Sequence, residues 1–173
     1  FGTAEQKERW LPPLIKGQMR TCFGVTEPTA GLNTSQIQTR AQRDGDQYIV
    51  NGQKMWTSTA QEADKILLLA RTTPIDEGER PFDGISLFFT DLNRDHVTIR
   101  EIEKMGRHAV DSNEVFFDDM PVPLSDLVGE EGKGFRYLLH GLNPERVLVA
   151  AEAVGMGEEA LDRAAKYAAE REV

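Results

Sequence analysis

The sequence has 173 residues, which fits one medium-sized domain or part of a larger protein. Its 29 acidic residues outnumber the 20 basic ones, and the formal net charge of −9 disfavours binding to nucleic acid or to an anionic membrane surface, because both depend on Lys and Arg. The longest apolar runs, such as residues 66–70, have the length of a strand and not the ~20 residues of a membrane-spanning helix. The single cysteine, Cys22, excludes an internal disulfide, and three separated histidines predict no metal site.

A short helix is predicted at the start of the chain. Thr3 is followed three residues later by Gln6, a capping-box pattern that predicts a helix beginning at Ala4. We expect the proline pair at 12–13 to kink or end this helix, and Gly17 to end the helical segment.

The middle of the chain has the period of β-strands. Ile37, Thr39 and Ala41 alternate with polar residues, as in a half-buried strand. A turn is predicted at residues 44–46, and the Asn51-Gly52 pair has the composition of a two-residue hairpin turn. Strands are predicted at residues 37–42, 48–50, 54–58, 65–72, 85–90, 97–101 and 114–117. The pattern predicts a mainly β fold, an antiparallel barrel or sandwich with helices at both ends.

Helical period returns near the end of the chain. The glycine-rich residues 129–134 fail as a phosphate loop, because Lys133 precedes Gly and no buried strand leads into them. Asn143-Pro144 predicts the start of a new helix that runs beyond Glu170. The chain begins with Phe1 and stops within a helical pattern, which predicts a segment of a longer protein.

Three segments hold the chemically informative residues, namely 22–34, 48–58 and 132–135 together with 143–146. The first ends in a loop of Pro, Gly and Thr, whose free N–H groups and hydroxyls suit the edge of a polar ring or a pyrophosphate. The second places an aromatic ring and two hydroxyls at a strand end. Each segment alone also fits an ordinary strand followed by a turn.

Together these segments resemble the acyl-CoA dehydrogenase family, above all in Val25-Thr26-Glu27-Pro28 and Asn51-Gly52-x-Lys54-x-Trp56. The resemblance covers essentially the whole chain. It implies that residues 1–20 end an N-terminal helical domain, residues 21–128 form a complete middle β domain, and residues 129–173 begin a C-terminal helical domain.

The resemblance implies FAD as cofactor. The residues that match the flavin-binding positions are Phe23, Val25, Thr26, Gly31, Leu32, Trp56, Thr57 and Ser58. Val25 and Thr26 would meet the pyrimidine edge, Trp56 would pack beside the ring, and Ser58 would bond near N5, the hydride acceptor. Leu32-Asn33 stands where many relatives have Ser-Asp, so a serine hydroxyl contact is missing and backbone contacts remain.

The implied reaction is α,β-dehydrogenation of an acyl-CoA thioester to the 2-enoyl-CoA, in which a carboxylate removes the α proton. Most relatives place this carboxylate further downstream, but the isovaleryl-CoA and long-chain enzymes place it at the position of Glu145. Leu32, Asn143 and Arg146 match substrate-binding positions. The alternative is an ordinary acid favoured by the helix dipole at Glu145 and an ordinary salt bridge at Arg146.

The resemblance also implies electron transfer to electron-transferring flavoprotein and a homodimer or homotetramer, with no nucleic-acid or membrane partner. Family sites draw on the C-terminal domain and a neighbouring subunit, so this chain alone is expected to be inactive and to bind FAD weakly or not at all. The compartment is the bacterial cytoplasm or the mitochondrial matrix, between which the residues do not decide. The alternatives are an acyl-CoA oxidase or flavin monooxygenase, a DNA-associated alkylation-response protein, which the net charge disfavours, and a β module without a ligand.

Overall fold

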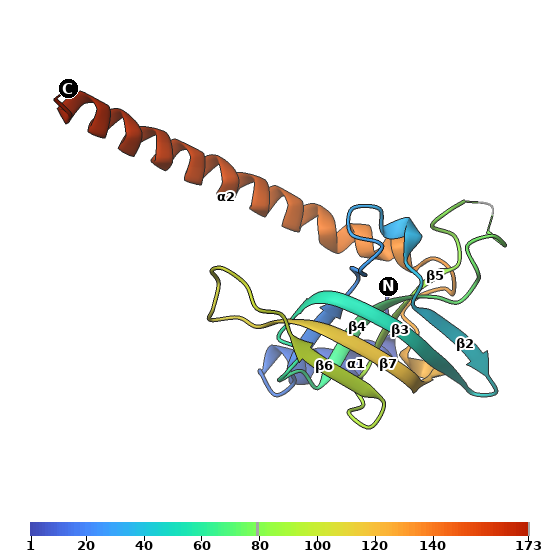
Figure 1. The fold of residues 1–173 in the computed structure, drawn as a ribbon. Helices are drawn as coiled ribbons and strands as arrows, with labels where there is room; N and C mark the ends of the chain where they lie inside the picture. The colour runs from blue at the N-terminus through green and yellow to red at the C-terminus, as the bar shows by residue number, and fades with distance from the viewer. Residues whose placement is uncertain (79, 173) are drawn as a thin grey trace. The chain divides into compact units, whose positions relative to one another are not determined.

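The computed structural model of the chain describes residues 1–78 and 80–172. It divides into two compact units, residues 1–137 and the residues from Leu138 onward. The first unit holds a helix and a seven-stranded sheet (Figure 1). The second unit consists of most of one long helix.

Helix α1 (Ala4–Ile15) begins with the predicted capping box, in which Thr3 and Gln6 each bond the backbone N–H of the other. The helix does not end at the prolines but continues to Ile15, because their carbonyls still accept N–H bonds from the residues that follow. Gly17, with φ +66°, ends the segment as predicted, since glycine adopts this left-handed conformation without steric cost. The Gln6 side chain then donates to two carbonyls near residue 126, which attaches α1 to the sheet unit.

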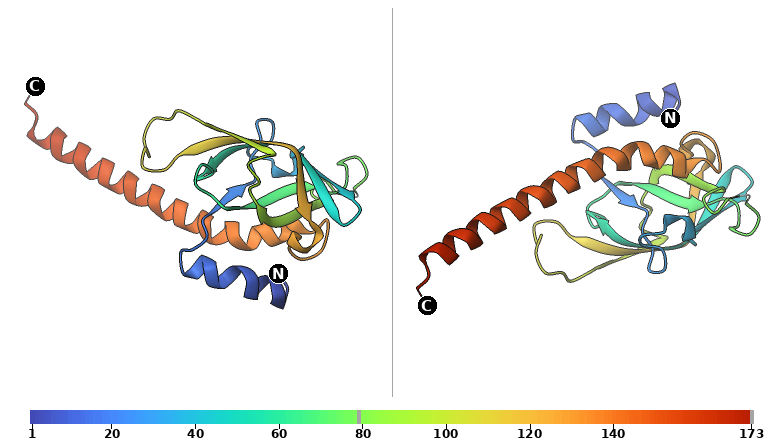
Figure 2. Two further views of the ribbon diagram at one scale, coloured as in Figure 1. Left: turned by 90° about the horizontal axis from the view of Figure 1, so that it is seen from below. Right: turned by 90° about the horizontal axis from the view of Figure 1, so that it is seen from above.

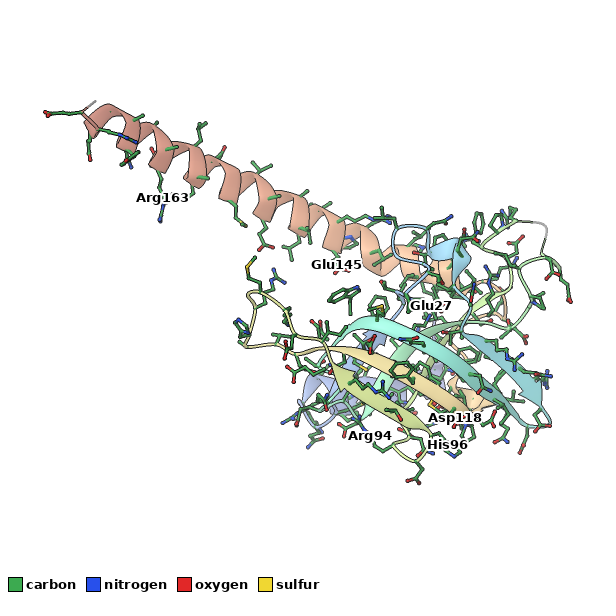
Figure 3. All side chains as sticks on the ribbon, in the orientation of Figure 1. Glu27, Arg94, His96, Asp118, Glu145 and Arg163 are labelled. Carbon is green, nitrogen blue, oxygen red and sulfur yellow. The ribbon has the colours of Figure 1, made fainter. Side chains whose placement is uncertain are left out.

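The sheet has the order β1-β4-β2-β3-β7-β6, and β5 pairs with β4. Its strands are β1 (Thr21–Gly24), β2 (Arg40–Asp44), β3 (Gln47–Ser58), β4 (Lys65–Arg71), β5 (Ile85–Asp91), β6 (Val97–Glu101) and β7 (Ser112–Pro123). Short 3-10 turns are η1 (Thr34–Gln36) and η2 (Leu124–Asp126). The mainly β fold with helices at both ends is confirmed, and the strands curl around one core (Figure 2).

The expectation of a wholly antiparallel sheet is wrong. β1 runs parallel to β4, and β2 makes one parallel pairing with β4. A parallel pair needs a long connection, and residues 25–64 supply it between β1 and β4. The predicted strand at 37–42 is also shifted, because ladder pairing begins only at Arg40 although the burial alternation starts at Ile37.

The predicted hairpin turn at Asn51-Gly52 is wrong, because both residues lie inside β3. The turn between β2 and β3 is at residues 45–46, within the other predicted turn. The register against β7 shifts between Val50 and Gly52, as in a β-bulge, and the Asn51 side chain bonds Asp119 on β7. Gly52 has φ +148°, and a Cβ there would lie 2.6 Å from the Cα of Thr39. Gly52 therefore permits the close approach of the β3 backbone to the backbone of Thr39.

Gly52→Ala is expected to destabilise the sheet by more than ~2 kcal/mol, since the added methyl group collides with backbone and requires a disfavoured φ. Gly45→Ala is the matched control: its φ is +61°, but a Cβ there meets no neighbour within 4 Å. Thermal unfolding should show a clearly larger fall in melting temperature for Gly52→Ala. Equal falls would mean that the close approach to Thr39 contributes nothing.

The core of the sheet unit is built from the apolar faces of the strands. The run predicted as strand-sized forms most of β4, where Ile66, Leu68 and Ala70 are buried. The Tyr48 and Phe88 rings meet edge to face with centroids 5.1 Å apart. This ring contact joins β3 to β5, the strand that pairs with β4 along its whole length.

Helix α2 (Gly134–Glu170) contains Pro144, so no new helix begins at Asn143 and that prediction is wrong. Proline removes one N–H bond from the helix interior, and α2 nevertheless continues through this position. In residues 1–78 and 80–172, no helix combines the length and the apolar character needed to cross a membrane.

Candidate functional site

The two segments expected to share a ligand lie side by side. The Met55 N–H donates to the Thr26 carbonyl (2.8 Å), and the Lys54 ammonium donates to the Val25 carbonyl (3.0 Å). Further along, the Thr59 hydroxyl lies 3.4 Å from the Thr21 carbonyl. The residues from β1 to Thr26 therefore run along the second half of β3.

Aromatic side chains from both segments face outward. In β1, Phe23 is exposed, whereas its neighbours Cys22 and Gly24 are buried. In β3, Trp56 is 56% exposed and Ser58 is also exposed. Val25 and Thr26, which follow β1, are half-buried. We call Phe23, Val25, Thr26, Trp56 and Ser58 the outer surface. Exposed rings next to hydroxyls and backbone groups suit a flat ligand with polar edges.

A bulge in β3 creates this arrangement. The register against β7 shifts between Lys54 and Thr57, and Trp56 adopts φ +60°, an uncommon conformation for a residue other than glycine. Lys54 and Thr57 are both fully buried, although residues three apart face opposite sides of a regular strand. The extra residue thus turns Trp56 outward and both flanking side chains inward. Such strain is typical of binding sites.

Thr57 lies differently from its neighbours. Its side chain points into the core, and its hydroxyl has no hydrogen-bond partner among the described residues. Its carbonyl accepts a bond from the Asn113 side chain (2.9 Å). Only the backbone of Thr57 can therefore take part in the outer surface.

Gly31 and Leu32 follow a tight turn in which Glu27 and Ala30 exchange backbone bonds. A Cβ at Gly31 would meet nothing within 4 Å, and the Leu32 side chain is wholly exposed. Both residues are thus accessible to a ligand on the loop after Thr26. A separate cavity of about 680 Å³ lies between residues 36–43 and 71–76 and includes none of the predicted site residues.

A buried ion pair holds the two segments together. The Lys54 ammonium, fully buried, lies 2.8 Å from the Glu27 carboxylate, which also accepts the N–H groups of Gln38 (2.6 Å) and Thr39 (3.0 Å). Sequence reasoning missed this role, because a lysine in a strand is usually read as exposed. The available signal was the position of Glu27 and Lys54 inside the two most specific motifs.

Burial alone would raise the pKa of Glu27, but the Lys54 charge and the hydrogen bonds outweigh it and hold that pKa below its ordinary 4.5. Burial lowers the pKa of Lys54 to about 8, against the opposing charge of Glu27. A carboxylate with a depressed pKa in the folded state stabilises the fold above its ordinary pKa, and this stability is lost as the pH falls through the folded value.

We therefore expect the wild-type protein to lose its stability advantage over Glu27→Gln as the pH falls below about 5. The measurement compares melting temperatures of the two proteins across acidic pH. A difference that stays constant down to unfolding would show that Glu27 does not carry its charge in the fold.

The third set of predicted residues lies on α2. Asn143, Glu145 and Arg146 are exposed there, and the Arg146 guanidinium donates to the Asn143 side chain (3.2 Å). Among the described residues Arg146 makes no salt bridge. Nor does the described part of the chain contain a group of three or more His, Cys, Asp or Glu arranged to hold a metal ion.

Comparison with known proteins identifies the class. Residues 22–120 match the family model of the acyl-CoA dehydrogenase middle domain, and residues 132–173 match that of the acyl-CoA dehydrogenase C-terminal domain. The acyl-CoA dehydrogenase FadE12 of Mycobacterium tuberculosis is 39% identical over 174 residues, covering 100% of this chain and 44% of that protein.

Solved structures agree. An acyl-CoA dehydrogenase from Geobacillus kaustophilus is 41% identical with a TM-score of 0.87, covering 100% of this chain and 45% of that one. The butyryl-CoA dehydrogenase from Megasphaera elsdenii is 36% identical with a TM-score of 0.83 and the same coverage. The chain therefore belongs to the acyl-CoA dehydrogenase family. It spans less than half the length of these relatives.

Proposed function

We propose that this chain carries the flavin site and part of the substrate site of an enzyme that oxidises an acyl-CoA thioester to the 2-enoyl-CoA. In this proposal residues 1–20 end the N-terminal helical domain, residues 21–128 form the middle β domain, and residues 129–173 begin the C-terminal domain. The observation that carries the proposal is the outer surface, where residues from two distant segments meet through bonds between residues 25–26 and 54–55.

The residues present fit FAD. The rings of Phe23 and Trp56 and the side chain of Val25 offer apolar contact, and the hydroxyls of Thr26 and Ser58 offer polar contact. The Thr26 N–H donates to no acceptor in the described part of the chain, which leaves it for a ligand. When bound, FAD supplies a hydride acceptor at N5. Thr26 and Ser58 would hold the polar ring edge, and the backbones of Gly31, Leu32 and Thr57 would complete the contacts.

Glu145 is the proposed general base. Its carboxylate would take the α proton of the thioester, and Asn143 and Arg146 would bind the CoA part of the substrate. Leu32 is proposed separately as a substrate-binding residue. The bond between Arg146 and Asn143 fixes the guanidinium on the side of α2 that carries both residues. A planar guanidinium suits phosphate groups, which CoA carries.

Electron-transferring flavoprotein is the proposed electron acceptor, and a homodimer or homotetramer the proposed assembly. The relatives reported above come from bacteria, which favours the bacterial cytoplasm over the mitochondrial matrix. The test is anaerobic bleaching of the flavin in the full-length protein by a panel of acyl-CoAs. Reoxidation by electron-transferring flavoprotein supports the proposal, whereas rapid oxygen uptake would favour the oxidase alternative.

Trp56→Ala should weaken FAD binding by about tenfold, because stacking on an exposed ring contributes roughly 1 kcal/mol beyond buried area. The measurement is the dissociation constant of FAD from the full-length apoprotein. Leu11→Ala, which removes an exposed apolar side chain on α1, is the control and should bind FAD as wild type does. Unchanged affinity in Trp56→Ala would remove this residue from the flavin site.

A further inference from the structure

A continuous series of hydrogen bonds links Arg71 to Glu27 through one peptide group. The Arg71 Nε–H donates to the carbonyl of Ile37 (2.8 Å). The same peptide continues with the N–H of Gln38, which donates to Glu27 Oε2 (2.6 Å). The bonds therefore run from the guanidinium, across a peptide, to the carboxylate.

The series continues to the outer surface. Glu27 Oε1 accepts from the Lys54 ammonium (2.8 Å), which also donates to the carbonyl of Val25 (3.0 Å). The other side of that peptide is the N–H of Thr26, the group left for a ligand. We call Arg71, Glu27 and Lys54, with the two peptides, the buried relay.

The buried relay carries more positive than negative charge. Its three side chains are buried, with exposed fractions of 5% (Arg71), 4% (Glu27) and 0% (Lys54). The buried relay therefore contains two cations and one carboxylate. The remaining bonds of Arg71 go to backbone carbonyls, those of Ser35, Pro81 and Asp83. In the described part of the chain no second carboxylate pairs with either cation. A net charge of about +1 thus lies in a low-dielectric interior, where its field is weakly screened.

Hydrogen bonds in series polarise one another. Because the ammonium bonds the Val25 carbonyl, the Thr26 N–H on the same peptide becomes a stronger donor. The buried relay ends on a peptide whose N–H has no acceptor among the described residues, and it places net positive charge next to that donor. Both features point toward a ligand that gains negative charge.

We propose that Lys54 and Arg71 are positioning residues that raise the reduction potential of the bound flavin, by stabilising the negative charge that the ring acquires on reduction. This inference rests on the proposed flavin site. Fixed positive charge and a polarised N–H near the ring favour the reduced state without contact between either side chain and the substrate.

The first test is the potential of Lys54→Gln in the full-length flavoprotein, measured by equilibration with reference dyes. The equilibrium constant for two-electron reduction should fall about tenfold, which is about 30 mV. Lys65→Gln is the matched control, because Lys65 is also a buried lysine of this sheet, paired with Asp91 outside the buried relay. Its potential should equal that of the wild type.

Arg71 supplies a second test that separates charge from structure. Arg71→Lys and Arg71→Met both lose the bonds to several carbonyls, but only Arg71→Met removes the charge. The potential should fall in Arg71→Met and stay near the wild-type value in Arg71→Lys. This pair decides the question if Lys54→Gln does not retain flavin.

The outcomes distinguish a failure of the buried relay from a failure of the proposed function. If wild-type protein binds flavin but Lys54→Gln and Arg71→Met keep its potential, the buried relay has no electrostatic role and the proposed function stands. Equal falls in Arg71→Lys and Arg71→Met would also overturn the charge account. If wild-type protein binds no flavin, the proposed function fails, and this inference fails with it.

Discussion

Glu145→Gln is expected to slow flavin bleaching by a good acyl-CoA substrate by about 10²–10⁴-fold, because an amide cannot accept the α proton. The measurement is anaerobic stopped-flow absorbance of the full-length protein at saturating substrate. Binding of the acyl-CoA should change little, because the amide keeps the size of the carboxylate. The loss should therefore appear in the maximal bleaching rate and not in the acyl-CoA concentration that gives half of that rate.

Glu158→Gln is the matched control for this experiment, since it removes another exposed acid from α2. It should bleach at the wild-type rate. Near-normal bleaching by Glu145→Gln would assign the proton transfer to a carboxylate further along the full-length protein. Glu145 would then be an ordinary exposed acid on α2.

Lys54→Met is expected to lower the free energy of unfolding by about 3–5 kcal/mol, the usual cost of removing one partner from a buried ion pair. The Glu27 carboxylate would keep its two backbone N–H donors but lose the ammonium 2.8 Å away. The Val25 carbonyl would lose its donor as well. Denaturant unfolding of the full-length protein measures the effect.

The exposed pair of Arg20 and Glu62 is the control, because its atoms are closer, at 2.6 Å, but both side chains are more than half exposed. Arg20→Met should cost less than about 1 kcal/mol. The double variant Glu27→Gln with Lys54→Met should be less destabilised than the sum of its single variants, since it leaves no unpaired charge. Additive losses would mean that the two side chains do not interact.

The sequence predicts the fold well where the signal is local. The capping box of Thr3 and Gln6, the apolar run of β4 and the turn before β3 all depend on neighbours in the chain, and the structure confirms them. The sequence predicts the sheet less well where contacts between distant residues determine which strands pair and in which direction. The parallel pairing of β1 with β4 has no local signal.

Asn51-Gly52 shows why the sequence places one turn wrongly. The pair has the composition of a hairpin turn, but Gly52 is needed because the backbone of Thr39 passes too close for a Cβ. Trp56 gives the corresponding case at the site. Strand alternation alone would not place Lys54 and Thr57 on the same inner face, because the bulge that does so is a tertiary feature. The bulge accounts for the inward Thr57 and the outward Trp56, whereas Lys54 keeps the alternation of the buried Tyr48 and Val50.

The visible spectrum of the purified full-length protein, before and after addition of FAD and then of acyl-CoA, tests the central claim most directly. The account predicts flavin absorbance that is lost on anaerobic addition of a suitable acyl-CoA and weakened flavin binding in Trp56→Ala. A protein that purifies without flavin and fails to bind added FAD would contradict the assignment of the outer surface.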